Sequence, residues 1–252
     1  MLTVDLNADL GESYGNYTIG NDDEIIPLIS SANVACGFHA GDPSVMLKTV
    51  RLIRESGSTG IGAHPAYPDL MGFGRRYMEL SMQEVRALMF YQLGALDGFC
   101  RVGGVELNHV KPHGALYNAT FKDKELARTI AEAVRDYNPG LKLLGLSNQN
   151  LVKAGEEAGL EVRHEVFADR AYEDDGTLVS RRKEGAMITD TDIAVGRVIR
   201  MVQEGRVESI GGHDIDIQAD SICVHGDGPK ALEFVREIRR QLGENGIEIK
   251  MM

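Results

Sequence analysis

The segment VELNHVKPHGALYN, residues 105–118, contains the pattern that decides the fold. It opens with a short run of apolar and β-branched residues, Val105 to Val110, which is typical of a strand, and polar residues follow directly. His109, Lys111 and His113 alternate, so in an extended chain their side chains point to one side. Two imidazoles and an ammonium group are costly to bury without partners. The pattern predicts a strand whose carboxyl end opens into a polar pocket.

The same succession of strand, loop and helix recurs along the whole chain. Helical periodicity follows the short apolar runs, and Ser81 with Glu84 forms a capping box ahead of a helix over Val85 to Leu96. Asp42 before Pro43 likewise predicts a helix start. We predict parallel strands at residues 2–7, 32–36, 60–64, 105–110, 142–146, 161–166 and 221–225.

Alternating strands and helices fit either a (β/α) barrel or a doubly wound sheet. Unusual polar residues follow several different strands, which suits a barrel mouth better than a single crevice. They are Asn7, Asp9, His39, His64, His109, His113, Asp169, His225 and Asp227. We therefore predict one α/β domain over residues 1–252, a TIM-barrel-like, seven-stranded (β/α) barrel. Asp174-Asp175-Gly176 predicts a small hairpin flap near residues 167–183.

Composition excludes several classes of protein. Lys and Arg number 27 against 38 Asp and Glu, a net charge of −11, so a nucleic acid is a poor partner. The 3 cysteines show no CxxC spacing, which argues against disulfides and a cysteine zinc site. The sequence has no basic leader and no apolar run of about 18 residues, so we expect a cytoplasmic protein without a membrane partner.

The polar residues at the strand ends are compatible with two chemistries. In one, an aspartate and several histidines hold a divalent metal that activates water or polarises a carbonyl. In the other, Asp9 is a general base, a histidine is the acid, and Lys111 steadies an oxyanion or phosphate. The long Gly-rich loop after residue 64 adds Arg75 and Arg76, either of which could bind a carboxylate or phosphate. GxxxxGK[ST], a strand-associated GxGxxG and GxSxG are all absent from the sequence.

Taken together, these segments resemble the LamB/YcsF family. The matching stretches are DLNADLGES at 5–13, NVACGFHAGDP at 33–43, GAHPAYPDLMGFGRR at 62–76, VKPHGALYN at 110–118, EVFADRAY at 165–172 and ICVHGD at 222–227. They occur in order over nearly the whole chain. The resemblance implies a barrel of the glycoside hydrolase/deacetylase superfamily.

The resemblance also implies the A subunit of a cytoplasmic, ATP-dependent 5-oxoprolinase, which opens 5-oxo-L-proline to L-glutamate together with partner subunits B and C. ATP would then bind on, or be shared with, those partners, in keeping with the missing nucleotide motifs. Metal-bearing relatives in the wider superfamily imply Asp9, His64 and His113 as ligands of a divalent metal. On this hypothesis Asp9 and His113 move protons and Lys111 steadies charge. The substrate-binding residues would be Asn7, His39, Arg76 and Asp169, with Arg76 receiving the substrate carboxylate.

Two other functions fit the same residues. One is a stand-alone metal-dependent deacetylase or amidohydrolase that acts on a small carbohydrate or amide. The other is a binding or regulatory protein without chemistry of its own. Hydrolysis without ATP and sensitivity to a chelator would distinguish the first, and catalysis that survives substitutions in the site would distinguish the second.

Overall fold

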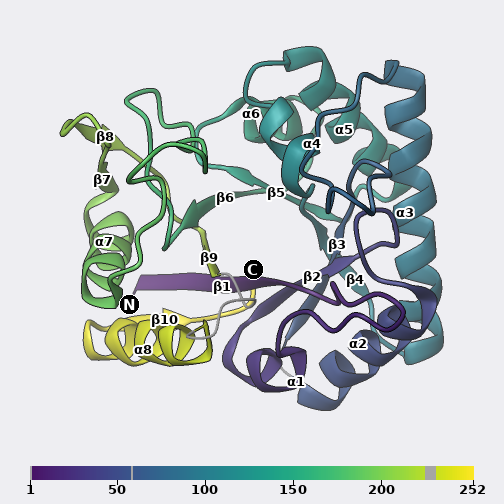
Figure 1. The fold of residues 1–252 in the computed structure, drawn as a ribbon, viewed down its shortest axis with the longest axis horizontal. Coiled ribbons are helices and arrows are strands. Elements are labelled where there is room, and N and C mark those ends of the chain that lie inside the picture. Colours follow the sequence, from purple (N-terminus) through teal and green to yellow (C-terminus); the bar gives the residue numbers. More distant parts are fainter. Residues whose placement is uncertain (1, 58, 225–230) are drawn as a thin grey trace.

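The computed structural model describes residues 2–57, 59–224 and 231–252, and its centre is a closed barrel of parallel strands. In the described chain the ring contains β1 (Leu2–Leu10), β2 (Ser31–Ala35), β3 (Gly60–His64), β4 (Leu107–Val110), β5 (Lys142–Leu146), β6 (Val162–Phe167) and β9 (Ser221–Val224). Pairing of β1 with β9 closes it. The view along the barrel shows strands surrounding the centre and helices outside them (Figure 1). The predicted seven-stranded barrel is confirmed, although His225, the expected end of the last strand, lies outside the described residues.

Helices cover the outside of the barrel. They are α1 (Asp22–Ile25), the 3₁₀ helix η1 (Ile26–Leu28), α2 (Pro43–Ser56), α3 (Met82–Gly103), α4 (Gly114–Ala119), α5 (Lys124–Tyr137), α6 (Asn150–Glu157), α7 (Thr191–Glu204) and α8 (Ala231–Glu244). The predicted helix starts are present: the Asp42 side chain accepts from the Ser44 and Val45 N–H groups, and Ser81 and Glu84 form the capping box. No helix among the described residues is long and apolar enough to span a bilayer.

The two faces of β1 separate the apolar core from a polar barrel interior. Leu6, Ala8 and Leu10 are buried in the hydrophobic core, which also includes side chains of α3 and α5. Asp5, which alternates with these residues, accepts hydrogen bonds from the hydroxyl groups of Ser31 of β2 and Ser221 of β9. The interior face is therefore polar, whereas TIM barrels usually fill theirs with branched apolar side chains.

Among the described residues, three short strands lie outside the closed ring. β7 (Arg206–Glu208) and β8 (Asp214–Asp216) form an antiparallel pair, and β10 (Ile247–Ile249) adds to the first residues of β1. In the region of the predicted flap, which stays a prediction, Gly176 has a φ of 78° and Tyr172 and Leu178 form an isolated antiparallel bridge. The assignment of residues 1–252 to one domain stays a prediction.

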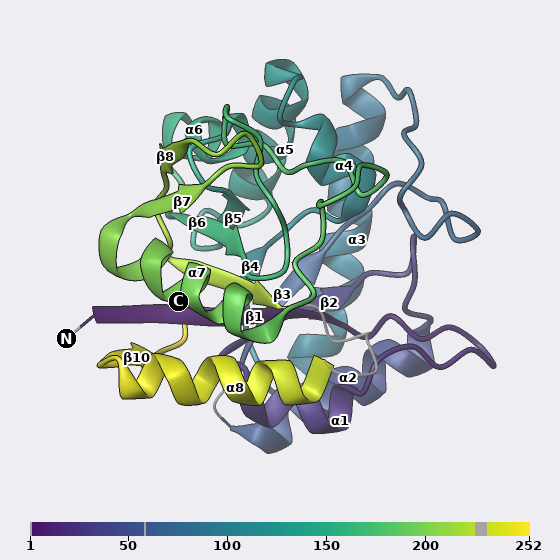
Figure 2. The same cartoon turned by 60° about the vertical axis from the view of Figure 1, so that its left-hand side comes forward.

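The loops that follow the strands gather at one end of the barrel. Figure 2 shows the loop after β1 projecting at the end opposite the N-terminus, while α7 and α8 run along one flank. Because all strands of the ring are parallel, their carboxyl ends meet at this same end. The polar residues that follow different strands in the sequence are therefore brought together here.

Candidate active site at the carboxyl ends of the strands

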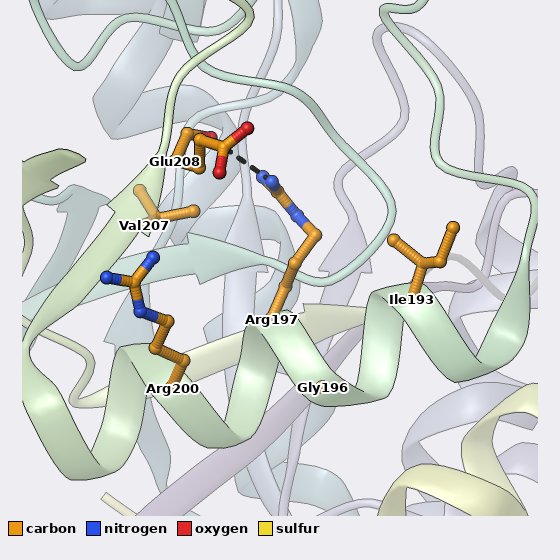
Figure 3. Close-up of a pocket in the computed structure, with 6 residues that line it drawn as sticks. All are labelled: Ile193, Gly196, Arg197, Arg200, Val207 and Glu208. Carbon is orange, nitrogen blue, oxygen red and sulfur yellow. Dashed lines mark hydrogen bonds between the residues drawn. The ribbon is translucent and has the colours of Figure 1, made fainter. Parts of the chain in front are cut away.

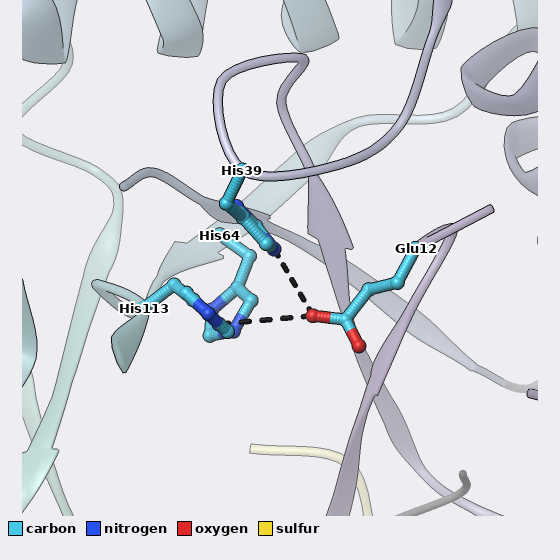
Figure 4. Close-up of side chains that lie close together, drawn as sticks. All are labelled: Glu12, His39, His64 and His113. Carbon is cyan, nitrogen blue, oxygen red and sulfur yellow. Dashed lines mark hydrogen bonds and ion pairs between the residues drawn. The ribbon is translucent and has the colours of Figure 1, made fainter. Parts of the chain in front are cut away.

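Four buried side chains from four different segments converge at the barrel mouth (Figure 4). Glu12 follows β1, His39 lies in the loop after β2, His64 ends β3, and His113 precedes α4. Their ligand atoms all lie within 4.8 Å of one another. We call these four residues the histidine cluster.

Hydrogen bonds fix which nitrogens of the cluster carry protons. His64 Nδ1 is 2.6 Å from the Lys111 carbonyl oxygen, and His113 Nε2 is 2.9 Å from the Phe73 carbonyl oxygen. A carbonyl can only accept, so both nitrogens donate, and a neutral imidazole has one N–H. The remaining nitrogens, His64 Nε2 and His113 Nδ1, are 2.9 Å apart with a lone pair each. This contact requires a cation or a shared proton between the rings.

The electrostatics favour a metal cation over extra protons. Burial is the main reason that the pKa values of His39 and His113 lie well below the ordinary 6.5. The neighbouring histidines lower these pKa values further, and the charge of Asp9 opposes the shift only in part. Neutral rings that donate their outer N–H to backbone carbonyls are the usual arrangement of metal-binding histidines. Three imidazoles and a carboxylate suit a divalent metal such as zinc. The histidine cluster therefore fits a metal ion.

Asp9 lies beside the cluster and connects it to Lys111. One Asp9 oxygen is 3.3 Å from His64 Nε2, and the other is 2.9 Å from Lys111 Nζ. His64 and His113 of the ligand set implied by the resemblance are thus in the cluster, with Asp9 adjacent. Sequence reasoning did not place Glu12 in the cluster, although it ends the polar segment that begins at Asp5.

Lys111 is buried between two carboxylates. Its Nζ is 2.9 Å from Asp9 Oδ1 and 2.7 Å from Glu165 Oε1, while the Tyr117 hydroxyl donates to Glu165 Oε2 at 2.7 Å. Burial by itself lowers the pKa of Lys111, but Asp9, Cys223 and Glu165 outweigh it and hold the pKa well above 10.5. Lys111 is therefore a fixed positive charge beside the histidine cluster. Sequence reasoning did not single out Glu165 or Tyr117, although both lie in stretches that match the family.

The remaining predicted residues occupy different places. Asn7 lies inside the barrel, where its Oδ1 accepts from Asn33 Nδ2 at 2.8 Å and is 3.3 Å from Lys111 Nζ. Asp169 follows β6, is half-buried, and accepts a hydrogen bond from Ile188 N through its backbone carbonyl. His225 and Asp227 lie outside the described residues.

Arg76 is held by a neighbour in its own loop. Its guanidinium forms an ion pair with Asp69, and this arginine keeps the pKa of Asp69 at about 2. The Arg76 side chain is 65% exposed, whereas Asp69 is almost fully buried at 4%. Its predicted role in binding a substrate carboxylate would require this pair to open.

A hollow lies on the outer flank of the molecule, between α7 and β7 (Figure 3). Its cations are already engaged: Arg197 donates to the Glu208 carbonyl, and Arg200 pairs with Asp214. None of its lining residues belongs to the histidine cluster. We therefore place the candidate site at the barrel mouth.

Comparisons with known proteins agree with this fold and cover the full chain. The model of the LamB/YcsF family matches residues 4–252. A protein of Clostridium beijerinckii, named as the A subunit of 5-oxoprolinase, is 57% identical over 249 residues, 99% of this chain and 97% of that protein. A Staphylococcus haemolyticus protein with the same name is 55% identical over 251 residues and 100% of both chains.

Solved structures confirm the predicted barrel fold. The lactam utilization protein from Thermus thermophilus superposes with a TM-score of 0.94 at 47% identity, covering 100% of both chains. A family 4 carbohydrate esterase from Streptomyces lividans, in complex with acetate, covers 99% of this chain and 92% of its own with a TM-score of 0.52. Its identity of 14% supports a shared fold alone. The chain belongs to the LamB/YcsF family.

Proposed function

We propose that this protein is the A subunit of a cytoplasmic, ATP-dependent 5-oxoprolinase that converts 5-oxo-L-proline to L-glutamate. The observation that carries the proposal is similarity over the full length, at 55% to 57% identity, to proteins that bear this name. The polar barrel mouth supports it, because lactam hydrolysis needs groups that move protons and groups that stabilise negative charge.

The ring opening requires the addition of water and the transfer of protons, which the site residues can perform. The hydroxyl of a water molecule adds to the carbonyl carbon, the carbon–nitrogen bond breaks, and a proton reaches the leaving nitrogen. We assign proton transfer to Asp9 and His113, which lie on either side of His64 Nε2 at 3.3 and 2.9 Å. Lys111 then stabilises the oxyanion or phosphate that forms at the carbonyl oxygen.

Two further assignments concern binding. Asn7, His39 and Asp169 would orient the lactam from different strands. A divalent metal, when held by Glu12, His39, His64 and His113, would supply Lewis-acid polarisation of a carbonyl oxygen. His113 would then serve as a ligand, and proton transfer would fall to Asp9.

ATP would be bound and used by partner subunits B and C. An amide resists hydrolysis, and transfer of the γ-phosphoryl group of ATP to its carbonyl oxygen releases ADP and makes the carbonyl carbon more electrophilic. Addition of one water and cleavage of the carbon–nitrogen bond then leave an acyl phosphate, which a second water hydrolyses to the carboxylate and phosphate. The chain has no P-loop or other nucleotide motif of its own. This division of labour places the energy source on the partners and the ring opening in the barrel.

The test is glutamate release from 5-oxo-L-proline by this protein alone and with the two partner subunits, each with and without ATP. We expect glutamate only from the mixture that contains all subunits and ATP. Because the fold and the histidine cluster also suit a metal-dependent deacetylase, each sample is assayed in parallel on acetylated sugars, with and without a chelator. Chelator-sensitive deacetylation by the protein alone, without glutamate release from any mixture, would contradict the proposal.

A further inference from the structure

Two adjacent arginines in the loop after β3 differ in whether their guanidinium groups form an ion pair. Arg76 is neutralised by the buried carboxylate of Asp69. Arg75 is exposed and makes no ion pair with any residue in the described ranges; its guanidinium instead lies 5.1 Å from the centre of the Phe73 ring. A guanidinium over an aromatic face keeps its in-plane N–H donors available for an oxyanion.

Phe73 contacts both Arg75 and the histidine cluster. Its backbone carbonyl accepts from His113 Nε2 at 2.9 Å, and its ring makes edge contacts with His39 and His113, with centroids 5.4 and 5.3 Å away. Phe73 has a φ of 54°, a conformation that is uncommon and strained for an aromatic residue. The ring therefore contacts both the cluster and the Arg75 guanidinium.

The loop backbone is also fixed against the barrel mouth. The Gly74 carbonyl accepts from Ala115 N at 2.9 Å, and Gly74 N donates to the Asp69 carbonyl at 2.9 Å. A Cβ at Gly74 would lie 2.9 Å from both His39 Cβ and His113 Cδ2, so only glycine allows this approach. Arg75 is thus held beside the cluster by a short, well-anchored turn.

An anionic substrate needs a cation at this entrance. The site contains the carboxyl groups of Asp9 and Glu12, and the chain as a whole carries a net charge of −11. Lys111 is buried, paired with Asp9 and Glu165 and assigned above to the carbonyl oxygen, and Arg76 is paired with Asp69. Arg75 is the cation of this loop that has no ion pair within the described ranges, and it directly follows Gly74, which packs against His39 and His113.

We propose that Arg75, not Arg76, binds the carboxylate of the lactam substrate and gives the site its preference for 5-oxo-L-proline over an uncharged lactam. This assignment rests on the proposed function. Binding of this kind uses two N–H groups of one guanidinium and both carboxylate oxygens, so a lysine should replace it only in part.

The experiment measures KM and kcat for 5-oxo-L-proline in the reconstituted complex with wild type, Arg75→Ala, Arg75→Lys and Arg76→Ala. We expect Arg75→Ala to raise KM about 10- to 100-fold with a smaller change in kcat, and Arg75→Lys to recover part of the loss. Arg76→Ala is the matched control, because it removes the same charge one residue away. It is made together with Asp69→Asn, so that no buried carboxylate loses its partner, and its KM should stay close to that of wild type.

A competitor without the carboxylate identifies the group that Arg75 binds. The inhibition constant of 2-pyrrolidinone, or its lower limit, should be the same for wild type and Arg75→Ala. An unchanged KM in Arg75→Ala, an equal or larger effect of Arg76→Ala, or weaker inhibition by 2-pyrrolidinone in Arg75→Ala would overturn the proposal. Absence of glutamate release by the wild-type complex would instead reject the proposed function.

Discussion

Two polar layers in the same barrel, one around Asp5 and one around Asp9 of β1, are satisfied in different ways. In the lower layer the buried Asp5 carboxylate accepts from Ser30 Oγ at 2.7 Å, from Ser31 Oγ at 2.6 Å and from Ser221 Oγ. In the upper layer Asp9 lies beside two histidine nitrogens whose lone pairs face each other. Both layers are polar and enclosed, so burial does not distinguish them. The two layers differ in how hydrogen-bond donors match acceptors. Of the two, only the upper layer needs an additional group between its facing lone pairs.

The largest expected effect comes from removing the charge that supports the upper layer. Lys111→Met leaves the fully buried Glu165 carboxylate without its ammonium partner, and we expect a loss of about 3–5 kcal/mol in the free energy of unfolding. Urea unfolding of the isolated protein measures this. The double variant Lys111→Met/Glu165→Gln should regain much of the stability while turnover stays low. Full recovery of turnover in the double variant would show that Lys111 is structural.

Removing a histidine from the cluster should abolish most of the turnover. His113→Ala is expected to reduce turnover of the reconstituted complex by about a hundredfold or more, as for loss of a general acid or base. Glutamate release per assembled complex is the readout, and assembly is checked by size-exclusion chromatography. His164→Ala, on β6 and outside the cluster, is the control and should keep turnover close to wild type. Wild-type turnover in His113→Ala would remove this residue from the site.

The titration of Asp5 in the lower layer should make the free energy of unfolding depend on pH. Burial raises the pKa of Asp5 above 3.8, more than its three serine donors lower it, so the folded state binds this proton more tightly than the unfolded state does. Stability from this group is therefore full at acidic pH and declines as pH rises from about 4 through the raised pKa. The loss is about 1.4 kcal/mol for each tenfold difference in proton affinity between the folded and unfolded states.

Asp5→Asn removes this titration, so the difference in unfolding free energy between wild type and variant should change between about pH 4 and about pH 7, with wild type losing relative stability. Urea unfolding at both pH values measures it. A difference that stays constant, or that changes in the opposite direction, would contradict the assignment.

Strand positions and the location of the site could be predicted from the sequence because both depend on local pattern. Short apolar runs followed by His64 or by His109, Lys111 and His113 indicate strands that end in a polar mouth. The strands β7, β8 and β10 have three residues each, too few for a periodic pattern to stand out. Their pairing depends on tertiary contacts rather than on local sequence.

The details of the site depend on geometry that no local pattern contains. Glu12 could equally have capped a turn, and only the meeting of four segments places its carboxylate against His39 at 3.0 Å. Arg75 and Arg76 are identical in residue type and adjacent in sequence. Their different roles follow from the buried Asp69 and from the unusual backbone of Phe73, and neither can be inferred from spacing.

The most direct test of the difference between the layers applies one chemical change to both. Asp5→Asn and Asp9→Asn each remove a carboxylate from the same face of the same strand, and kcat for glutamate release is measured in the reconstituted complex with ATP. We predict a loss of at least about a hundredfold for Asp9→Asn and turnover close to wild type for Asp5→Asn. Equal losses in both variants, or full activity in Asp9→Asn, would contradict the assignment of the chemistry to the upper layer.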